Sequence, residues 1–190
     1  MRISTVILAA GAGTRLGGVA KALLEGRGKR SFLATILATA REVGLDDAIV
    51  VVGPPFGDAV AAHARELGAR VAINERPERG MASSVAIGFA ALAACDAAWL
   101  WPVDHPDVDA GTLRALVAAL GTHDAARPVH DGRGGHPPLC ARSLFAALAG
   151  CADLEGGARA VLADADVIAV PVADRGCVRD VDTAVDLEAG

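Results

Sequence analysis

Short apolar runs alternate with helix-like segments along most of this 190-residue chain, and this alternation is the strongest constraint on its fold. The first run, residues 2–8, is rich in β-branched side chains and predicts a buried strand. Helical periodicity follows over residues 31–43 and ends at Gly44, and a second apolar strand is expected at residues 48–52. A strand, a helix and a second strand in this order are typical of a parallel sheet.

The same alternation continues beyond the second strand. Further strands are expected at residues 70–73, 97–101 and 125–129, around residue 139, and at residues 167–170. Helices are expected at residues 57–67, 81–94 and 110–120, from residue 143, near residues 158–162, and from residue 183. Strands separated by helices without a long linker predict a single three-layer α/β/α domain over residues 1–190, with a mostly parallel, Rossmann-like sheet.

A glycine-rich segment follows the first strand directly: residues 8–17 read LAAGAGTRLG, and Lys21 comes shortly after. Gly11 and Gly13 permit close backbone approach, so successive N–H groups can converge on phosphate oxygens. Arg15 would add a planar cation and Lys21 a mobile one, which suits a polyphosphate. The combination predicts a bound nucleoside triphosphate, whereas the glycines alone would also fit an ordinary turn with solvated basic residues.

Two common phosphate-binding motifs do not fit the chain. A P-loop requires Gly-Lys followed by Ser or Thr, but the Gly-Lys pair at residues 28–30 reads GKR. A dinucleotide fingerprint requires a third glycine where Leu16 stands, and a ribose-binding carboxylate after the second strand, where residues 52–55 read VGPP. These departures argue against a P-loop and against a nicotinamide cofactor.

Composition narrows the range of partners. Charged residues make up 22% of the chain, the net charge is −5, and there is no polybasic run. Extended nucleic acid and an anionic membrane surface are therefore not expected as partners. No apolar stretch reaches the length of about 20 residues that crosses a bilayer, and the chain begins with a strand pattern rather than a signal peptide. We expect a cytoplasmic protein.

The cysteines and histidines do not form a recognisable metal motif. The four cysteines lack a C-x-x-C pair, so we expect small apolar core residues rather than zinc ligands or disulfides; they are Cys95, Cys140, Cys151 and Cys177. The five histidines lack the close paired spacing of a zinc helix. A metal bound by these residue types is not expected.

Two aspartates are the candidates for a metal site. Asp104 follows an apolar strand and lies between Pro102 and Pro106, which restrict its loop. Ligands of open α/β sheets bind outside the carboxyl ends of strands, where Asp104 and the glycine-rich segment both fall. Asp182 has the ordinary interpretation of capping a last helix. The functional alternative is that Asp104 and Asp182 jointly hold Mg²⁺, and sequence spacing leaves both open.

Six motifs, in order along nearly the whole chain, resemble those of the MobA-like nucleotidyltransferases, and more narrowly the molybdenum cofactor cytidylyltransferases. They are residues 8–17 with Lys21, and residues 80–84 (GMASS), 104–106 (DHP), 135–137 (GHP), 157–159 (GAR) and 180–183 (DVDT). The resemblance implies a fold of the nucleotide-diphospho-sugar transferase type.

The resemblance also implies roles for individual residues. Nucleotide binding would fall on Leu8, Ala9, Ala10, Gly11, Gly13, Arg15, Lys21, Gly80, Ser83 and Ser84. The implied catalytic residues are Arg15, Lys21 and Asp104, and the implied metal ligands are Asp104 and Asp182. His136 and Arg159 would contact the acceptor. Ala10 stands where guanylyltransferases of the family carry glycine, and it therefore favours CTP.

The activity implied by the resemblance is Mg²⁺-dependent transfer of CMP from CTP to the phosphate of a molybdopterin-type cofactor, with release of pyrophosphate. Such a phosphate has a second pKa of about 6 and needs no strong general base. The resemblance also implies transient contact of this protein with a molybdoenzyme or with its chaperone. The alternatives are GTP as donor, another small phosphomonoester such as a sugar or polyol phosphate as acceptor, or a non-catalytic nucleotide-binding protein that delivers the cofactor. A dehydrogenase is a further alternative, and binding of a reduced nicotinamide would support it.

Overall fold

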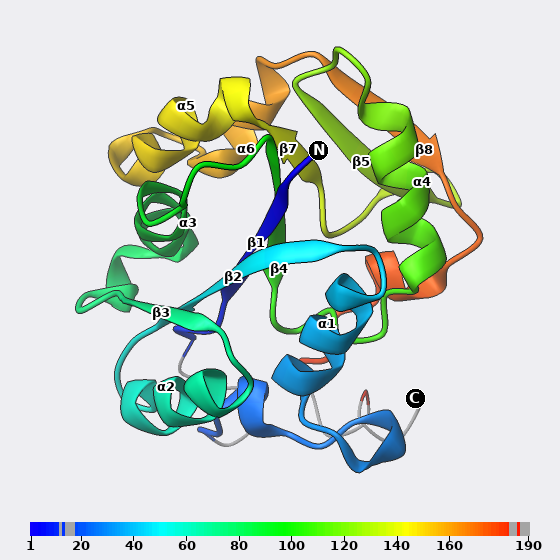
Figure 1. Ribbon diagram of the computed structural model, residues 1–190. Coiled ribbons are helices and arrows are strands. Elements are labelled where there is room, and N and C mark those ends of the chain that lie inside the picture. The colour runs from blue at the N-terminus through cyan, green and yellow to red at the C-terminus, as the bar shows by residue number, and fades with distance from the viewer. Residues whose placement is uncertain (12, 14–17, 183–185, 187–190) are drawn as a thin grey trace.

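The protein is described here by a computed structural model covering residues 1–11, 13, 18–182 and 186. Within these residues, eight strands form one sheet in the order β3-β2-β1-β4-β7-β5-β6, and β8 pairs with β5 (Figure 1). The strands are β1 (Ile3–Leu8), β2 (Leu45–Val52), β3 (Arg70–Ile73), β4 (Ala97–Pro102), β5 (Ala125–His130), β6 (Arg133–Gly134), β7 (Leu139–Ala141) and β8 (Val167–Pro171).

Parallel pairing dominates the sheet. Strand β1 lies between β2 and β4 and is parallel to both, β3 extends this set, and β8 is parallel to β5. The exceptions are β7, which runs antiparallel between β4 and β5, and β6, which forms a hairpin with β5. The predicted fold class, an α/β domain with a mostly parallel central sheet flanked by helices, is confirmed.

Helices cover both faces of the sheet (Figure 1). One face packs against α1 (Phe32–Arg41), α2 (Gly57–Glu66) and α4 (Ala110–Leu120). The other packs against α3 (Met81–Ala90), α5 (Phe145–Ala149) and α6 (Ala158–Ala163). Short 3-10 segments are found at Lys21–Leu23, Arg27–Lys29, Pro77–Arg79, Arg142–Leu144, Cys151–Asp153 and Arg175–Val178. Among the described residues, no helix is long and apolar enough to cross a membrane.

The alternation of side chains along β1 explains how one strand serves two core layers. Successive residues of a strand point to opposite faces. Ile3 and Ile7 therefore pack in the layer with α1, α2 and α4, whereas Val6 and Leu8 pack with α3, α5 and α6. All six residues of β1 are buried, which places the carboxyl end of this strand in the middle of the sheet.

Helix boundaries follow local capping chemistry where the sequence supplies it. The Ser31 hydroxyl accepts a hydrogen bond of 3.1 Å from the Ala34 N–H and caps α1, close to the predicted start. By contrast, the helix predicted to end at residue 94 ends at Ala90. The predicted helix was too long because the alanine-rich sequence contains no stop signal before β4. The helix predicted from residue 143 begins as a 3-10 turn, and α5 starts at Phe145.

The turn-rich segment at residues 131–138 contains a hairpin that the sequence analysis did not identify. Asp131 and Gly132 have positive φ angles of 48° and 74°, and β5 and β6 pair on either side of them. An Asp-Gly pair suits a two-residue hairpin, because both positions require positive φ. The helix predicted from residue 183 falls largely outside the described residues.

Candidate active site

The end of β1 runs between its two parallel neighbours. The Ala9 N–H donates to the Val51 carbonyl at 2.8 Å, and the Leu8 carbonyl accepts from the Val103 N–H at 3.1 Å. These bonds continue the sheet pairing past the last residue of β1. The glycine-rich segment therefore leaves the sheet at its carboxyl edge, in the position predicted for a ligand site.

Gly13 is required by the fold of the glycine-rich segment. Its φ is +56°, and a Cβ atom there would lie 2.0 Å from the carbonyl oxygen of Val19. The Gly18 N–H donates to the Gly13 carbonyl at 3.0 Å, which closes the segment on itself. Residues 12 and 14–17, including the predicted phosphate ligand Arg15, lie outside the described residues.

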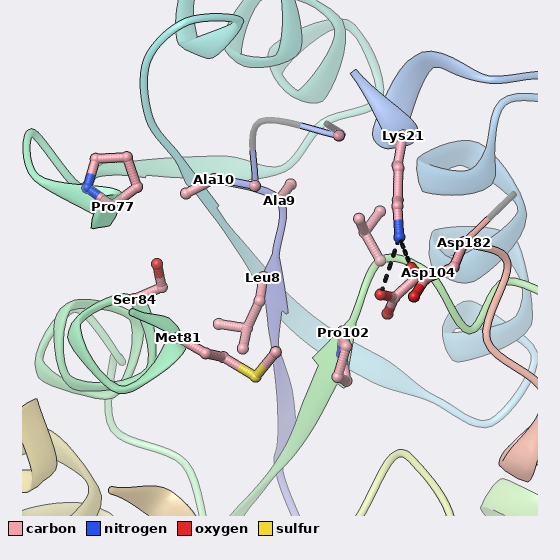
Figure 2. Close-up of a pocket in the computed structure, with 13 residues that line it drawn as sticks. Leu8, Ala9, Ala10, Lys21, Pro77, Met81, Ser84, Pro102, Asp104 and Asp182 are labelled. Atoms are coloured by element: carbon pink, nitrogen blue, oxygen red, sulfur yellow. Dashed lines mark hydrogen bonds and ion pairs between the residues drawn. The ribbon is translucent and has the colours of Figure 1, made fainter. Parts of the chain in front are cut away.

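Lys21 contacts both candidate metal ligands. Its ammonium nitrogen Nζ lies 3.3 Å from Oδ2 of Asp104 and also donates to Oδ1 of Asp182 (Figure 2). The three side chains are between 15% and 25% exposed, so they are shielded from solvent on most sides. Lys21 and the two aspartates, which lie 83 and 161 positions further along the chain, thus form one charge cluster at the cavity wall.

Backbone hydrogen bonds hold the two carboxylates in place. After β4, the His105 N–H donates to the Pro102 carbonyl at 3.2 Å, which turns the chain at Asp104. The Val181 N–H then donates to the Asp104 carbonyl at 2.8 Å. This bond docks the last described segment against the turn, so that Asp182 comes to face Lys21.

A cavity of about 300 Å³ opens beside this cluster. Nine of the predicted site residues line it: Leu8, Ala9, Ala10, Gly11, Gly13, Lys21, Ser84, Asp104 and Asp182. Pro77, Met81, Pro102 and Val103 complete the wall, and the sequence analysis did not assign them to the site. Figure 2 shows the cluster of Lys21 on one side of the cavity and Ser84 on the other.

The Ser84 side of the cavity is organised by Asn74, which is only 2% exposed. The Asn74 Nδ2 donates to the hydroxyl oxygens of Ser83 and Ser84, both at 2.9 Å. Ser83 in turn donates to the Gly80 carbonyl at 2.8 Å. Ser83 and Gly80, predicted to bind nucleotide, do not line the cavity, whereas Ser84 does. A single asparagine after a strand gives no motif by which the sequence could have identified it.

A second cavity, of about 530 Å³, adjoins the first. The two share three lining residues, which are Leu8, Met81 and Pro102. The predicted acceptor residues His136 and Arg159 both line the second cavity, together with Arg127 and apolar side chains from α3, α6 and β4. Most of the predicted nucleotide residues therefore line the first cavity, and both predicted acceptor residues line the second.

Arg127 is a site residue that the sequence analysis missed. Its Nε donates to the Gly135 carbonyl at 3.3 Å, and its Nη2 donates to the Gly134 carbonyl at 3.2 Å. A Cβ atom on Gly134 would lie 2.7 Å from the guanidinium carbon, so any side chain at this position would displace the guanidinium of Arg127. These two hydrogen bonds hold the guanidinium of Arg127 at the second cavity. The accepting loop includes the GHP motif at residues 135–137 that the sequence analysis identified.

His136 is neutral over the physiological pH range. Burial, reinforced by the charges of His105 and Arg127, lowers the pKa of His136 to about 3. The rings of His105 and His136 lie 4.9 Å apart, and among the described residues neither Nδ1 atom has a hydrogen-bond partner. His136 therefore does not supply a positive charge to the second cavity, which it lines.

The cysteines behave as the sequence predicts. All four are free and buried. Burial raises the pKa of the Cys140 thiol to about 12, and burial together with Asp174 raises that of Cys177 to about 11. These thiols stay protonated and do not serve as nucleophiles.

The residues at the charge cluster fit a divalent metal ion. Asp104 and Asp182 converge on one cationic atom, and carboxylate oxygens are the ligands preferred by Mg²⁺. Among the described residues, no group of three or more histidines, cysteines, aspartates or glutamates could hold a metal ion. A divalent ion here would therefore depend on two carboxylates and on oxygens of a bound phosphate, which is how Mg²⁺ commonly binds at phosphate sites.

The chain is similar to known proteins over most of its length. The model of the MobA-like NTP transferase domain matches residues 5–170. The chain is 31% identical over 193 residues to the nicotine blue oxidoreductase of Paenarthrobacter nicotinovorans, covering 95% of this chain and 92% of that protein. The crystal structure of Rv0371c from Mycobacterium tuberculosis H37Rv has a TM-score of 0.78 and 27% identity, over 100% of this chain and 97% of that one.

A manganese complex of Rv0371c from the same organism is also similar, with a TM-score of 0.70 and 26% identity over 90% of this chain and 88% of that one. The region matched by the domain model contains most of β1, all of β2 to β7, the helices that line the two cavities, Lys21 and Asp104. Asp182 lies beyond its last matched residue.

Proposed function

Because the chain belongs to the MobA-like NTP transferase family, we propose that this nucleotidyltransferase is a Mg²⁺-dependent cytidylyltransferase acting on a molybdopterin-type cofactor. In the proposed reaction, a phosphate oxygen of the acceptor attacks the α-phosphorus of CTP. The bond from the α-phosphorus to the bridging oxygen breaks, pyrophosphate leaves, and CMP is joined to the acceptor through a new phosphoanhydride bond.

One observation carries the proposal: Lys21, Asp104 and Asp182 form a single charge cluster at the cavity bordered by Gly11 and Gly13. Phosphoryl transfer needs positioning and charge neutralisation more than covalent chemistry from the protein. Backbone N–H groups of the glycine-rich segment would bind phosphate oxygens, and Lys21 would neutralise charge at the reacting phosphate. Arg15 is proposed to bind the departing pyrophosphate.

Asp104 and Asp182 would hold the metal ion, which when bound neutralises phosphate charge and orients the oxygens. The nucleophile needs no protein base, because a phosphate monoester is already largely ionised near neutral pH. On the acceptor side, Arg127 and Arg159 can pair with anionic groups, and neutral His136 can orient the acceptor by a hydrogen bond. The apolar wall of the second cavity suits an acceptor with a ring system.

The choice of CTP rests on Ala10, which is 4% exposed and lines the first cavity. Ala10 packs where Gly53 allows close approach: a Cβ on Gly53 would lie 3.2 Å from the Ala10 Cβ and 3.3 Å from Pro77. We propose that the methyl group of Ala10 limits the space beside the base, which would favour a pyrimidine over a purine. We expect Ala10→Gly to raise the turnover of GTP relative to CTP.

The decisive experiment is a matrix of nucleoside triphosphates against acceptors, with products identified by mass and pyrophosphate release measured in parallel. The acceptors are the molybdopterin-type cofactor, a sugar phosphate and a polyol phosphate. We expect CTP with the cofactor to give the mass of a CMP adduct, and chelation of divalent metal to abolish it. A sugar or polyol adduct would move the proposal to another phosphomonoester, and a GMP adduct would overturn the role of Ala10.

Variants test the site itself. Asp104→Asn should lower turnover by more than about a hundredfold, since losing one electrostatic contact of this kind typically costs 10²–10³ in rate. Asp131→Asn is the matched control, because Asp131 lies at an exposed hairpin with positive φ that asparagine tolerates. Normal turnover by Asp104→Asn with Mg²⁺ as the metal would contradict the proposed site.

The similarity to nicotine blue oxidoreductase favours a second candidate, an oxidoreductase that uses the same two cavities. It predicts binding of a reduced nicotinamide, which a fluorescence titration detects directly. The third possibility, a nucleotide-binding delivery protein, predicts tight nucleotide binding without pyrophosphate release for any acceptor. A cytoplasmic location, contact with a molybdoenzyme or its chaperone, and residues 1–190 acting as one domain stay predictions.

A further inference from the structure

We propose that Asn74 sets the hydrogen-bond polarity of Ser84, so that the first cavity always presents a hydroxyl donor to the base of the bound nucleotide. Ser84 would then recognise a carbonyl oxygen or an unprotonated ring nitrogen of that base. The inference rests on the proposed function, because it takes the first cavity to hold a nucleoside triphosphate. Asn74 itself does not line the cavity, and its proposed role is that of a positioning residue.

The orientation of the Asn74 amide is fixed by a backbone group. Its Oδ1 accepts a hydrogen bond of 3.0 Å from the N–H of Arg76. A backbone N–H can only donate, so the oxygen of the amide must point toward Arg76 and the nitrogen toward the serines. The Nδ2 group supplies two protons, and each serine hydroxyl oxygen accepts one of them.

The two serines then differ in what they do with their own protons. Ser83 gives its proton to the Gly80 carbonyl, which leaves it engaged on both sides. Ser84 has no recorded acceptor for its proton among the described residues. Figure 2 shows its hydroxyl oxygen directed toward the space between Pro77 and Ala10. Because Asn74 occupies the Ser84 oxygen as a donor, the Ser84 proton stays available for a ligand.

Asn74→Asp reverses this polarity with almost no change of shape. One carboxylate oxygen still accepts from the Arg76 N–H, but the other now accepts where the amide donated. Ser84 must then give its proton to Asp, and only lone pairs face the base. We expect CTP to bind at least about tenfold more weakly, since an unmatched acceptor in a cavity costs more than a missing hydrogen bond.

A double-mutant cycle with Ser84→Ala separates polarity from general damage. In the Ser84→Ala background, Asn74→Asp should weaken CTP binding by less than about threefold, because the group whose polarity it reverses is gone. Asn74→Ala, which leaves Ser84 free to donate, should weaken CTP binding less than Asn74→Asp does, although it removes more atoms. The reverse order, or an equal loss in both backgrounds, would overturn the inference.

Two further measurements keep the result interpretable. Inorganic tripolyphosphate reports the phosphate part of the cavity and the added charge alone, and Asn74→Asp should weaken its binding much less than that of CTP. Thr112→Val is the matched control for loss of a buried hydrogen bond, here to Asp174 and away from both cavities, and it should leave CTP affinity unchanged. If the wild type binds neither CTP nor tripolyphosphate, the proposed function fails. If it binds both and the cycle shows no coupling, only the role of Asn74 fails.

Discussion

Lys21→Met should have opposite effects on the two charged ligands of the site. The wild-type ammonium is paired with both Asp104 and Asp182, which are the residues proposed to hold the metal. A metal ion that binds without nucleotide must therefore compete with Lys21 for these carboxylates. Removing the ammonium changes the charge of the cluster from −1 to −2, so affinity for a divalent cation should rise. Affinity for tripolyphosphate should fall, because a cation is lost beside the glycine-rich segment.

The size of the metal effect follows from the two ion pairs. At 3.3 Å, the distance between Lys21 Nζ and Asp104 Oδ2, the Coulomb energy is about 5 kcal/mol for an effective dielectric constant of 20. Since the side chains are 15–25% exposed, desolvation and screening reduce the net value to about 1 kcal/mol for each pair. Two pairs give about 2 kcal/mol, which corresponds to an increase of about 30-fold in metal affinity.

Electron paramagnetic resonance of free Mn²⁺ measures this affinity directly, in the absence of nucleotide. Lys29→Met is the matched control, because Lys29 is exposed and does not line either cavity. We expect the control to bind Mn²⁺ as the wild type does. If folded Lys21→Met bound Mn²⁺ no more tightly than the wild type, the two carboxylates would not be the metal ligands, or Lys21 would not compete for them.

Three further changes test other parts of the structure. Thr5→Val should raise the free energy of unfolding in urea by about 1 kcal/mol, because the buried Thr5 hydroxyl has no partner among the described residues; a loss would refute this explanation. Unfolded His136 takes up a proton below pH 6.5 and folded His136 only near pH 3, so stability should fall by about 2 kcal/mol between pH 7 and pH 5, and His136→Asn should remove that part of the slope. Gly13→Ala should weaken tripolyphosphate binding at least about tenfold, because its Cβ would meet a backbone carbonyl at 2.0 Å, whereas Gly111→Ala, with open space around it, should not.

The sheet was predictable because its residues obey local rules. The burial of β1 follows from its mostly apolar, β-branched sequence, and the start of α1 follows from the Ser31 hydroxyl. The antiparallel insertion of β7 was not predictable from local sequence, since three residues carry no directional signal. Likewise, an alanine-rich helix has no marked end, and the boundary of α3 depends on where the chain must re-enter the sheet.

The candidate site likewise contains residues that the sequence could predict and residues that it could not. The glycine-rich segment and Asp104 closely follow the carboxyl ends of parallel strands, so the rule for parallel sheets brings them together. Asn74 and Arg127 act through hydrogen bonds to Ser84 and to the Gly134 carbonyl, and these pairs belong to no motif that the sequence could report. The contacts of Asn74 and Arg127 are visible only in the folded chain.

Met81 lies at the border between the proposed nucleotide cavity and the proposed acceptor cavity. It is a large apolar residue at the first position of α3, yet it is 62% exposed, and it lines both cavities together with Leu8 and Pro102. An exposed methionine contributes little to the core, so its position is better explained by ligands that cover it. If CTP occupies the first cavity and the acceptor the second, the reacting phosphates must meet above this shared wall. Asp104 follows Pro102 by two residues, which puts the metal-binding carboxylate of the proposal at that same border.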